Sequence, residues 1–155
     1  MDTVLALDIG GRRTGVAFFS PEVGIPMPLA TLSHASEAEC ASLTVEIVQK
    51  RHVGRIFIGL PLLPSGQEGK QAGLVRSVAE LLQKSLPDVL FEFIDERYTT
   101  PKNTDSKRSD PDAEAACEIL RIGLAKDCKR SKSPFRTVTK MDLPYSEQFL
   151  YTKEP

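Results

Sequence analysis

One stretch constrains the fold of this chain more than any other, residues 4–17 with the sequence VLALDIGGRRTGVA. Four consecutive apolar residues precede Asp8 and a turn with two glycines. A near-continuous apolar run is typical of a strand buried on both faces, so we expect 4–7 to form a central strand. A carboxylate at the end of such a strand is costly to bury unpaired, which predicts a cation or an opening to solvent beside Asp8. The presence of Asp8 is explained equally well if it is an ordinary turn residue ahead of the two glycines.

Composition limits the kinds of protein that this chain can be. At 155 residues and 41% hydrophobic content, it fits one domain with a sizeable core. No apolar run approaches the roughly 20 residues of a membrane span, and the three cysteines form no CxxC pair. These features predict a soluble cytoplasmic protein without a membrane segment, a disulfide framework or a zinc site. With only two histidines, we expect any catalysis to depend on carboxylates.

The rest of the pattern predicts an α/β chain in which strands and helices alternate. Further strands are expected at 14–20, 27–32, 55–59 and 89–94, and helices at 36–51, 72–87 and from 110 onward. The short Gly-Arg turn indicates that the second strand is antiparallel to the first, and the strand, helix, strand order over 27–59 indicates a parallel crossover. Ser36 and Glu39 form a capping-box pattern before an expected apolar stripe of Ala38, Ala41, Val45 and Val48.

Acidic residues follow two of the expected strands and begin the last helix. The candidates are Asp8, one of Asp95 and Glu96, and one of Asp110 and Asp112. Active sites gather at strand ends, where such residues converge. Converging carboxylates repel one another unless a cation neutralises them, and oxygen ligands favour Mg²⁺, with Mn²⁺ as the alternative. Such a site suits phosphoryl chemistry.

Helix geometry separates the last pair of acids. Asp112 shares the inward stripe with Ala116, Ile119 and Leu120, whereas Asp110 fits the N-cap. Strand alternation leaves the choice between Asp95 and Glu96 open. The glycines at 10, 11 and 15 are interpreted as allowing the backbone to approach a charged substrate closely.

Basic charge is concentrated near the end of the chain. Residues 126–140 contain six basic residues and one acid, whereas the net charge of the whole chain is −1, so the remainder carries about −6. Nucleic-acid binding is therefore expected to be local, and Lys129, Arg130 and Lys132 are candidate phosphate contacts. Arg97 is interpreted either as a salt-bridge partner of its acidic neighbours or as a phosphate clamp.

Taken together, the motifs of this chain resemble those of the YqgF family of ribonuclease H-like proteins, which are described as Holliday junction resolvases and as pre-16S rRNA nucleases. Four blocks match in order and span about four fifths of the chain. They are Leu7-Asp8-Ile9-Gly10 with Arg13 and 15–17, Gly59-Leu60-Pro61 with Gly66, 68–69 and 71–72, Asp95-Glu96-Arg97 with 99–100, and Asp112 with 115–116, Ile119 and Leu120.

The resemblance implies a mixed five-stranded RNase H-like sheet, three antiparallel strands followed by parallel ones, flanked by helices. It also implies that Asp8, Glu96 and Asp112 are catalytic and hold Mg²⁺. Arg13, Lys70 and Arg97 are then the expected substrate contacts. The chain departs from the family at Leu63, at Ala113 and in a short 101–111 segment.

The implied function is Mg²⁺-dependent hydrolysis of structured nucleic acid, in processing the 5′ end of pre-16S rRNA. The alternatives are Holliday junction resolution and a non-catalytic module that binds structured RNA or branched DNA. We expect a nuclease domain at 1–126 and a basic tail at 127–155. The sequence does not distinguish between a monomeric and a homodimeric oligomeric state.

Overall fold

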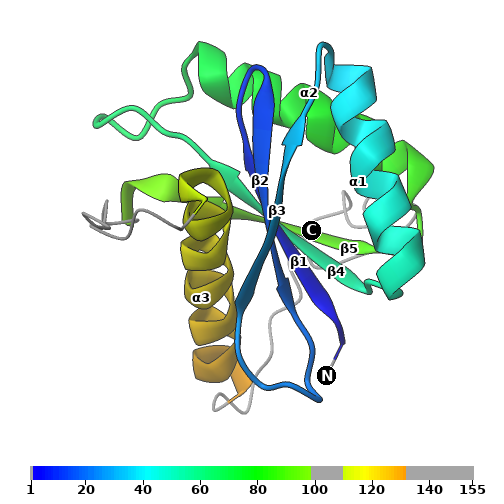
Figure 1. Cartoon of the computed structure of the whole chain (residues 1–155). Helices are drawn as coiled ribbons and strands as arrows, with labels where there is room; N and C mark the ends of the chain where they lie inside the picture. Colours follow the sequence, from blue (N-terminus) through cyan, green and yellow to red (C-terminus); the bar gives the residue numbers. More distant parts are fainter. Residues whose placement is uncertain (1, 99–109, 132–155) are drawn as a thin grey trace, which may run out of the picture.

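The computed structural model of the chain describes residues 2–98 and 110–131. These residues form a five-stranded sheet with helices on both faces (Figure 1). The elements in chain order are β1 (Val4–Ile9), β2 (Arg13–Phe19), β3 (Met27–Ser33), α1 (Glu37–Arg51), β4 (Arg55–Leu60), α2 (Lys70–Ser85), β5 (Leu90–Asp95), η1 (Glu96–Tyr98) and α3 (Pro111–Ser131). No helix within the described ranges is both long and apolar enough to cross a bilayer.

The sheet has the order β3-β2-β1-β4-β5. Strands β1, β2 and β3 are antiparallel neighbours, whereas β4 and β5 run parallel to β1. This arrangement confirms the predicted mixed sheet. Strand β3, which contains Pro28, lies at the edge of the sheet, where proline is tolerated.

The predicted central strand is β1. Leu5, Ala6 and Leu7 are fully buried, because β1 has a neighbour on each side and helices cover both faces. Asp8 pairs with Gly15 of β2, near the carboxyl end of the strand. The first polar side chain of β1 therefore lies where the sheet ends.

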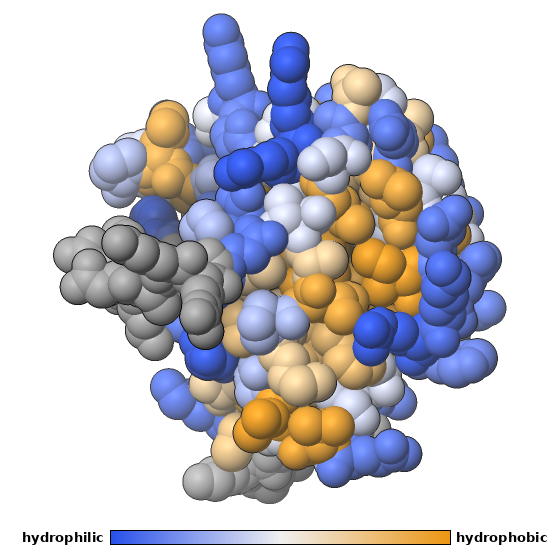
Figure 2. All heavy atoms as spheres, in the orientation of Figure 1, coloured by the Kyte–Doolittle hydropathy of each residue, from blue (hydrophilic) through white to orange (hydrophobic). Residues whose placement is uncertain are grey.

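Two apolar layers hold the helices to the sheet. Helices α1 and α2 cover one face, with Leu5, Leu7 and Ile58 in that layer. Helix α3 covers the other face, with Ala6 and Phe57 in its layer. Asp8 alternates with Leu7 along β1, so its side chain belongs to the α3 face. Apolar surface is also visible beside β3 (Figure 2), where Met27, Leu29 and Leu32 are half-buried.

Helix α1 begins at the predicted N-cap. The Ser36 hydroxyl accepts the Glu39 N–H at 3.1 Å, and the Glu39 carboxylate accepts the Ala35 N–H at 2.9 Å. The predicted apolar stripe is wrong at Ala38, which is exposed. Cys40 and Thr44 are buried instead. The Thr44 hydroxyl can be buried because it donates a hydrogen bond to the Cys40 carbonyl at 2.8 Å.

Helix α3 begins after Asp110, whose carboxylate accepts the Asp112 N–H at 3.2 Å, as expected of an N-cap. It continues to Ser131, past the expected boundary at residue 126. Near this end of the helix, the Asp127 carboxylate pairs with Arg55 of β4 at 2.6 Å, which attaches this turn to the sheet. The remaining part of the expected tail, 132–155, lies outside the described residues.

Candidate active site

Three acids come from three different elements at one edge of the sheet. Asp8 lies on β1, and Glu96 follows β5 directly as the first residue of η1. Asp112 is the second residue of α3. Because β1, β4 and β5 are parallel, their carboxyl ends meet at this edge.

Two glycines allow these elements to come close. A Cβ at Gly15 would lie 1.8 Å from the backbone oxygen of Asp112, so only glycine lets the start of α3 rest on β2. A Cβ at Gly59 would lie 2.3 Å from Oε1 of Glu96, so the Glu96 side chain passes over β4. The interpretation of Gly15 as a site of substrate approach is therefore corrected, because the helix backbone fills that space.

Asp8 and Glu96 form a hydrogen-bonded pair of carboxyl groups. Burial raises the pKa of Asp8, the hydrogen bond to Glu96 lowers it, and the nearby charge of Asp112 raises it. Burial, the charge of Asp8, the hydrogen bond with Asp8 and the charge of Asp95 together raise the pKa of Glu96 to about 8. At neutral pH Glu96 therefore holds a proton that it donates to Asp8.

Asp112 forms an ion pair with a nearby arginine. Its Oδ2 atom lies 2.8 Å from Nη2 of Arg13. The same oxygen is buried and accepts no hydrogen bond from any residue in the described part of the chain, so the guanidinium is close to it but not aligned with it. With the side chains in these positions, no three His, Cys, Asp or Glu residues among 2–98 and 110–131 form a preformed metal-binding site.

The expected substrate contacts lie around the same edge. Arg13 begins β2, and Lys70 is the exposed first residue of α2. Gln71 donates to the Ile9 carbonyl at 3.0 Å, which attaches the start of α2 to the end of β1. Figure 2 shows hydrophilic side chains along this upper edge, above the β1–β2 turn and the start of α2.

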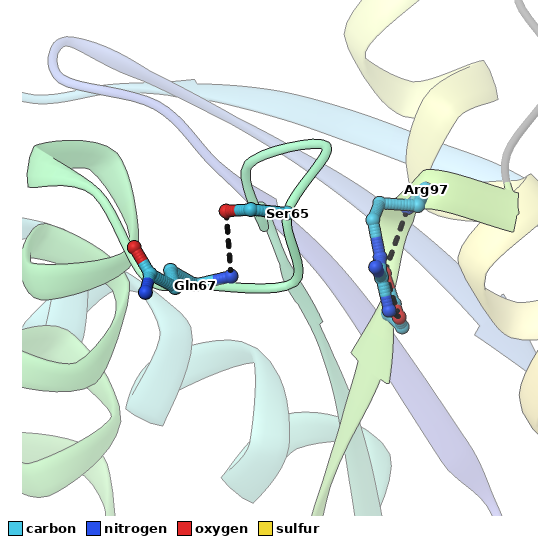
Figure 3. A network of polar contacts seen from close by, with 4 residues as sticks. Ser65, Gln67 and Arg97 are labelled. Atoms are coloured by element: carbon cyan, nitrogen blue, oxygen red, sulfur yellow. Dashed lines mark hydrogen bonds and ion pairs between the residues drawn. The ribbon is translucent and has the colours of Figure 1, made fainter.

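Arg97 is an exposed residue held by its acidic neighbour. Its Nη2 atom donates to Asp95 Oδ2 at 2.7 Å, and its backbone N–H donates to Asp95 Oδ1 at 2.9 Å. The hydrogen bond from Arg97 is the main cause that lowers the pKa of Asp95. In Figure 3 the loop that carries Ser65 and Gln67 faces Arg97, and a Cβ at Gly66 would lie 3.2 Å from its Nη1.

The structure separates the two acids that strand alternation left open. Glu92 and Ile94 lie on the α3 side of β5, and Glu96 continues this alternation toward Asp8. Asp95 belongs to the opposite side and pairs with Arg97. Gly59 was missed as a residue on which the site depends. Its signal in the sequence was its place in the Gly59-Leu60-Pro61 block, at the end of an apolar strand.

The departures from the family have different surroundings. Leu63 is 48% exposed in the loop between β4 and α2, where its N–H donates to the Gln67 carbonyl at 2.8 Å. Ala113 is buried at the contact of α3 with Gly15. Residues 101–109 of the short segment lie outside the described residues.

Comparisons with known proteins agree with the resemblance. The chain matches the family model described as RuvX, Holliday junction resolvase, over residues 2–126. A Chloroflexus aurantiacus protein named "Putative pre-16S rRNA nuclease" is 41% identical over 98 residues, 63% of this chain and 63% of that relative. A Rickettsia typhi protein of the same name is 33% identical over 133 residues, 79% of this chain and 85% of the relative.

Solved structures extend the comparison to the fold. The RuvC protein of Thermus thermophilus, solved in complex with a Holliday junction substrate, superposes with a TM-score of 0.60 at 10% identity and covers 83% of this chain and 97% of its own. The same protein solved as "Thermus thermophilus RuvC structure" gives a TM-score of 0.59 at 8% identity, covering 82% and 96%. The match to the Chloroflexus relative spans less than two thirds of its length. With the family model covering most of the chain and the sheet order in agreement, this chain belongs to the RuvX family and has the RNase H-like fold of RuvC.

Proposed function

We propose that this chain is a metal-dependent nuclease that hydrolyses phosphodiester bonds in structured nucleic acid. The observation that carries the proposal is the pairing of Asp8 with Glu96 at the ends of two parallel strands, with the charge of Asp112 acting on Asp8. Such crowding of carboxyl groups raises pKa values and is typical of functional sites. Membership of a nuclease-named family supports the same reaction class.

The acids fit a hard divalent cation in their donor chemistry. All three offer carboxylate oxygens, and Asp112 Oδ2 is a buried acceptor that receives no hydrogen bond from residues 2–98 and 110–131. Asp8, Glu96 and Asp112 are the proposed ligands of Mg²⁺, or of Mn²⁺ in its place. A bound ion of this kind would supply Lewis acidity toward the phosphate and a more acidic water.

The protein groups around the acids have separate roles in this proposal. The proton between Glu96 and Asp8 leaves before both carboxylates act as ligands, because ligands bind metal in their charged form. Arg13, Lys70 and Arg97 contact substrate phosphates, which positions the strand without reading its sequence. Arg97 is already oriented by Asp95, so it loses little freedom when a phosphate binds.

We propose the 5′ end of pre-16S rRNA as the substrate, because the names of the sequence relatives point to it. Holliday junction resolution is the second candidate, favoured by the description of the family model. Two scissile strands related by symmetry call for a homodimer, whereas a single cut in RNA needs only a monomer. We propose a cytoplasmic location, because the three cysteines form no CxxC pair and no disulfide joins them in the described part of the chain.

Cleavage of both substrates by one preparation tests the proposal. With Mg²⁺, wild-type protein is expected to cut a pre-16S rRNA fragment faster than a four-way DNA junction. Asp8→Asn is expected to lower the cleavage rate about a thousandfold. Without this charged ligand the metal ion is poorly positioned, and several kcal/mol of transition-state stabilisation are lost.

Asp88→Asn is the matched control, because Asp88 lies in the connection after α2 rather than among the three acids. Its rate should equal that of wild type. An Asp8→Asn protein that is folded and cuts at the parent rate would contradict the proposal. Binding without any cleavage by wild type would favour the non-catalytic module.

A further inference from the structure

Arg13 has two candidate partners, Asp112 and a substrate phosphate, and its guanidinium cannot contact both at the same time. Three carboxyl groups lie at the site, and the Arg13 guanidinium is an exposed cation that pairs with one of them, Asp112. The same guanidinium is a proposed phosphate contact. While it lies on Asp112, it competes with any cation that the acid would bind.

The backbone around Arg13 is fixed, but its side chain is not enclosed. The Arg13 carbonyl accepts the Gly10 N–H at 2.9 Å, and a Cβ at Gly10 would lie 2.6 Å from that oxygen. The Arg13 side chain is nevertheless 63% exposed, whereas that of Asp112 is 28% exposed. A long exposed side chain on a rigid turn reaches a second partner by rotation about its own bonds.

The geometry of the ion pair also favours exchange. Nη2 and Oδ2 are 2.8 Å apart, but the oxygen accepts no aligned hydrogen bond. Charge attraction without alignment is weaker than the paired N–H donation that arginine gives to carboxylates. A contact between a buried oxygen and an exposed cation is therefore easily replaced.

We propose that Arg13 is a positioning residue that neutralises Asp112 while no metal is bound and moves to a substrate phosphate when metal takes that carboxylate. Metal binding and nucleic-acid binding then strengthen each other, because each favours the same position of Arg13. This inference rests on the proposed function, since it needs both a metal and a phosphate ligand.

Calorimetric titration of the full chain with Mn²⁺ in low salt, without nucleic acid, tests the first half. Arg13→Gln is expected to bind Mn²⁺ about threefold more tightly than wild type, the size of effect typical of a partly exposed ion pair. Arg12→Gln is the matched control. It removes the same charge from the neighbouring exposed residue, which makes no ion pair with any residue in the described part of the chain.

The control should raise the Mn²⁺ affinity by a smaller factor than Arg13→Gln. Equal gains in the two variants, or no gain in Arg13→Gln, would overturn the inference. Asp112→Asn separates this failure from that of the proposed function. If Asp112→Asn binds Mn²⁺ as wild type does, the metal site itself is wrong, whereas a loss there with no gain in Arg13→Gln rejects only the role of Arg13.

The second half is tested by anisotropy with a labelled four-way DNA junction and a labelled RNA hairpin, in Ca²⁺ and in EDTA. Arg13→Gln is expected to weaken binding about threefold in Ca²⁺ and to have little effect in EDTA, where Arg13 is held by Asp112. An equal loss under both conditions would overturn the coupling. Wild-type protein that binds neither probe would contradict the proposed function.

Discussion

Two charged clusters lie under α3, one at each end of the helix, and they solve the problem of buried charge in opposite ways. At the far end, Arg55 donates to Asp127 at 2.6 and 3.0 Å and to Glu92 at 2.5 Å. There a forked cation lies between two acids. At the other end, Asp8 and Glu96 share a proton, and Asp112 pairs with the unaligned Arg13.

The comparison teaches which cluster maintains the fold and which is available for chemistry. In the Arg55 cluster the three side chains are at most 20% exposed and their charges are matched by hydrogen bonds. In the acid cluster the burial of like charges opposes folding. Natural proteins retain such unfavourable groups mainly at functional sites.

The largest expected effect comes from removing the cation of the satisfied cluster. Arg55→Met removes the guanidinium that pairs with the buried Glu92 and Asp127 carboxylates, and with it the contact with the Phe57 ring, 4.8 Å from its centroid. We expect the free energy of unfolding to fall by about 3–5 kcal/mol in urea titrations.

Arg121→Met is the matched control for that change. Arg121 is also an arginine paired on α3, with Glu118 at 3.2 Å, but its side chain is 50% exposed. The loss there should be about 0–1 kcal/mol. Equal losses in the two variants would remove the distinction drawn between buried and exposed pairs.

An intermediate effect is expected where α3 rests on the sheet at the acid cluster. Gly15→Ala forces a Cβ against the Asp112 backbone oxygen, so the start of the helix must shift. We expect a loss of about 1–3 kcal/mol in thermal unfolding, together with weaker Mn²⁺ binding.

Gly11→Ala provides the comparison, because a Cβ there meets nothing within 4 Å. It should be close to neutral in both measurements. If Gly15→Ala were equally tolerated, the acid cluster would not depend on this close approach.

The smallest expected effect has the opposite sign, because neutralising the acid cluster stabilises the fold. Burial raises the pKa of Glu96 from 4.5 to about 8, so between these values the folded state binds more protons than the unfolded state. The free energy of unfolding of wild type therefore falls as pH rises through this window. Glu96→Gln keeps an N–H donor for Asp8 without this titration, and should be more stable at pH 8 by about 1–2 kcal/mol, allowing for partial exposure.

Melting temperatures measured from pH 4 to pH 9 test this sign. The two proteins should agree near pH 4 and diverge as the pH rises, while Glu80→Gln, at an exposed residue paired with Lys84, should follow wild type throughout. A wild-type protein that gains stability over Glu96→Gln toward pH 8 would show that Glu96 is ionised and stabilised in the fold.

Local patterns predicted most of the fold but little of the charge pairing. The apolar run at 4–7 identified β1, and the Ser36 hydroxyl caps α1 as its sequence indicates. Such features depend on neighbours in the chain. Asp127 was assigned to a tail, because its partner Arg55 is 72 residues away and no periodicity connects them.

For the candidate site, the sequence indicated the acids but not the spaces between them. The structure brings Asp8 and Glu96 together and puts Asp112 within electrostatic reach of Asp8, while their role as ligands stays a prediction. The need for Gly59 could not be predicted, because it arises from a side chain that crosses from another strand. Alternation alone could not choose Glu96 over Asp95 without knowing which face α3 covers.

Helix α3 links the two clusters, because the rotation of the helix at one cluster sets its rotation at the other. Asp112 and Asp127 are 15 positions apart on one uninterrupted helix, about 22 Å along its axis. Gly123 fixes the middle, since a Cβ there would lie 2.4 Å from the Phe57 ring. Inserting or deleting one residue between these anchors would turn one end by about 100° relative to the other. In this family, the helix segment between these two positions should therefore tolerate substitutions far better than insertions or deletions.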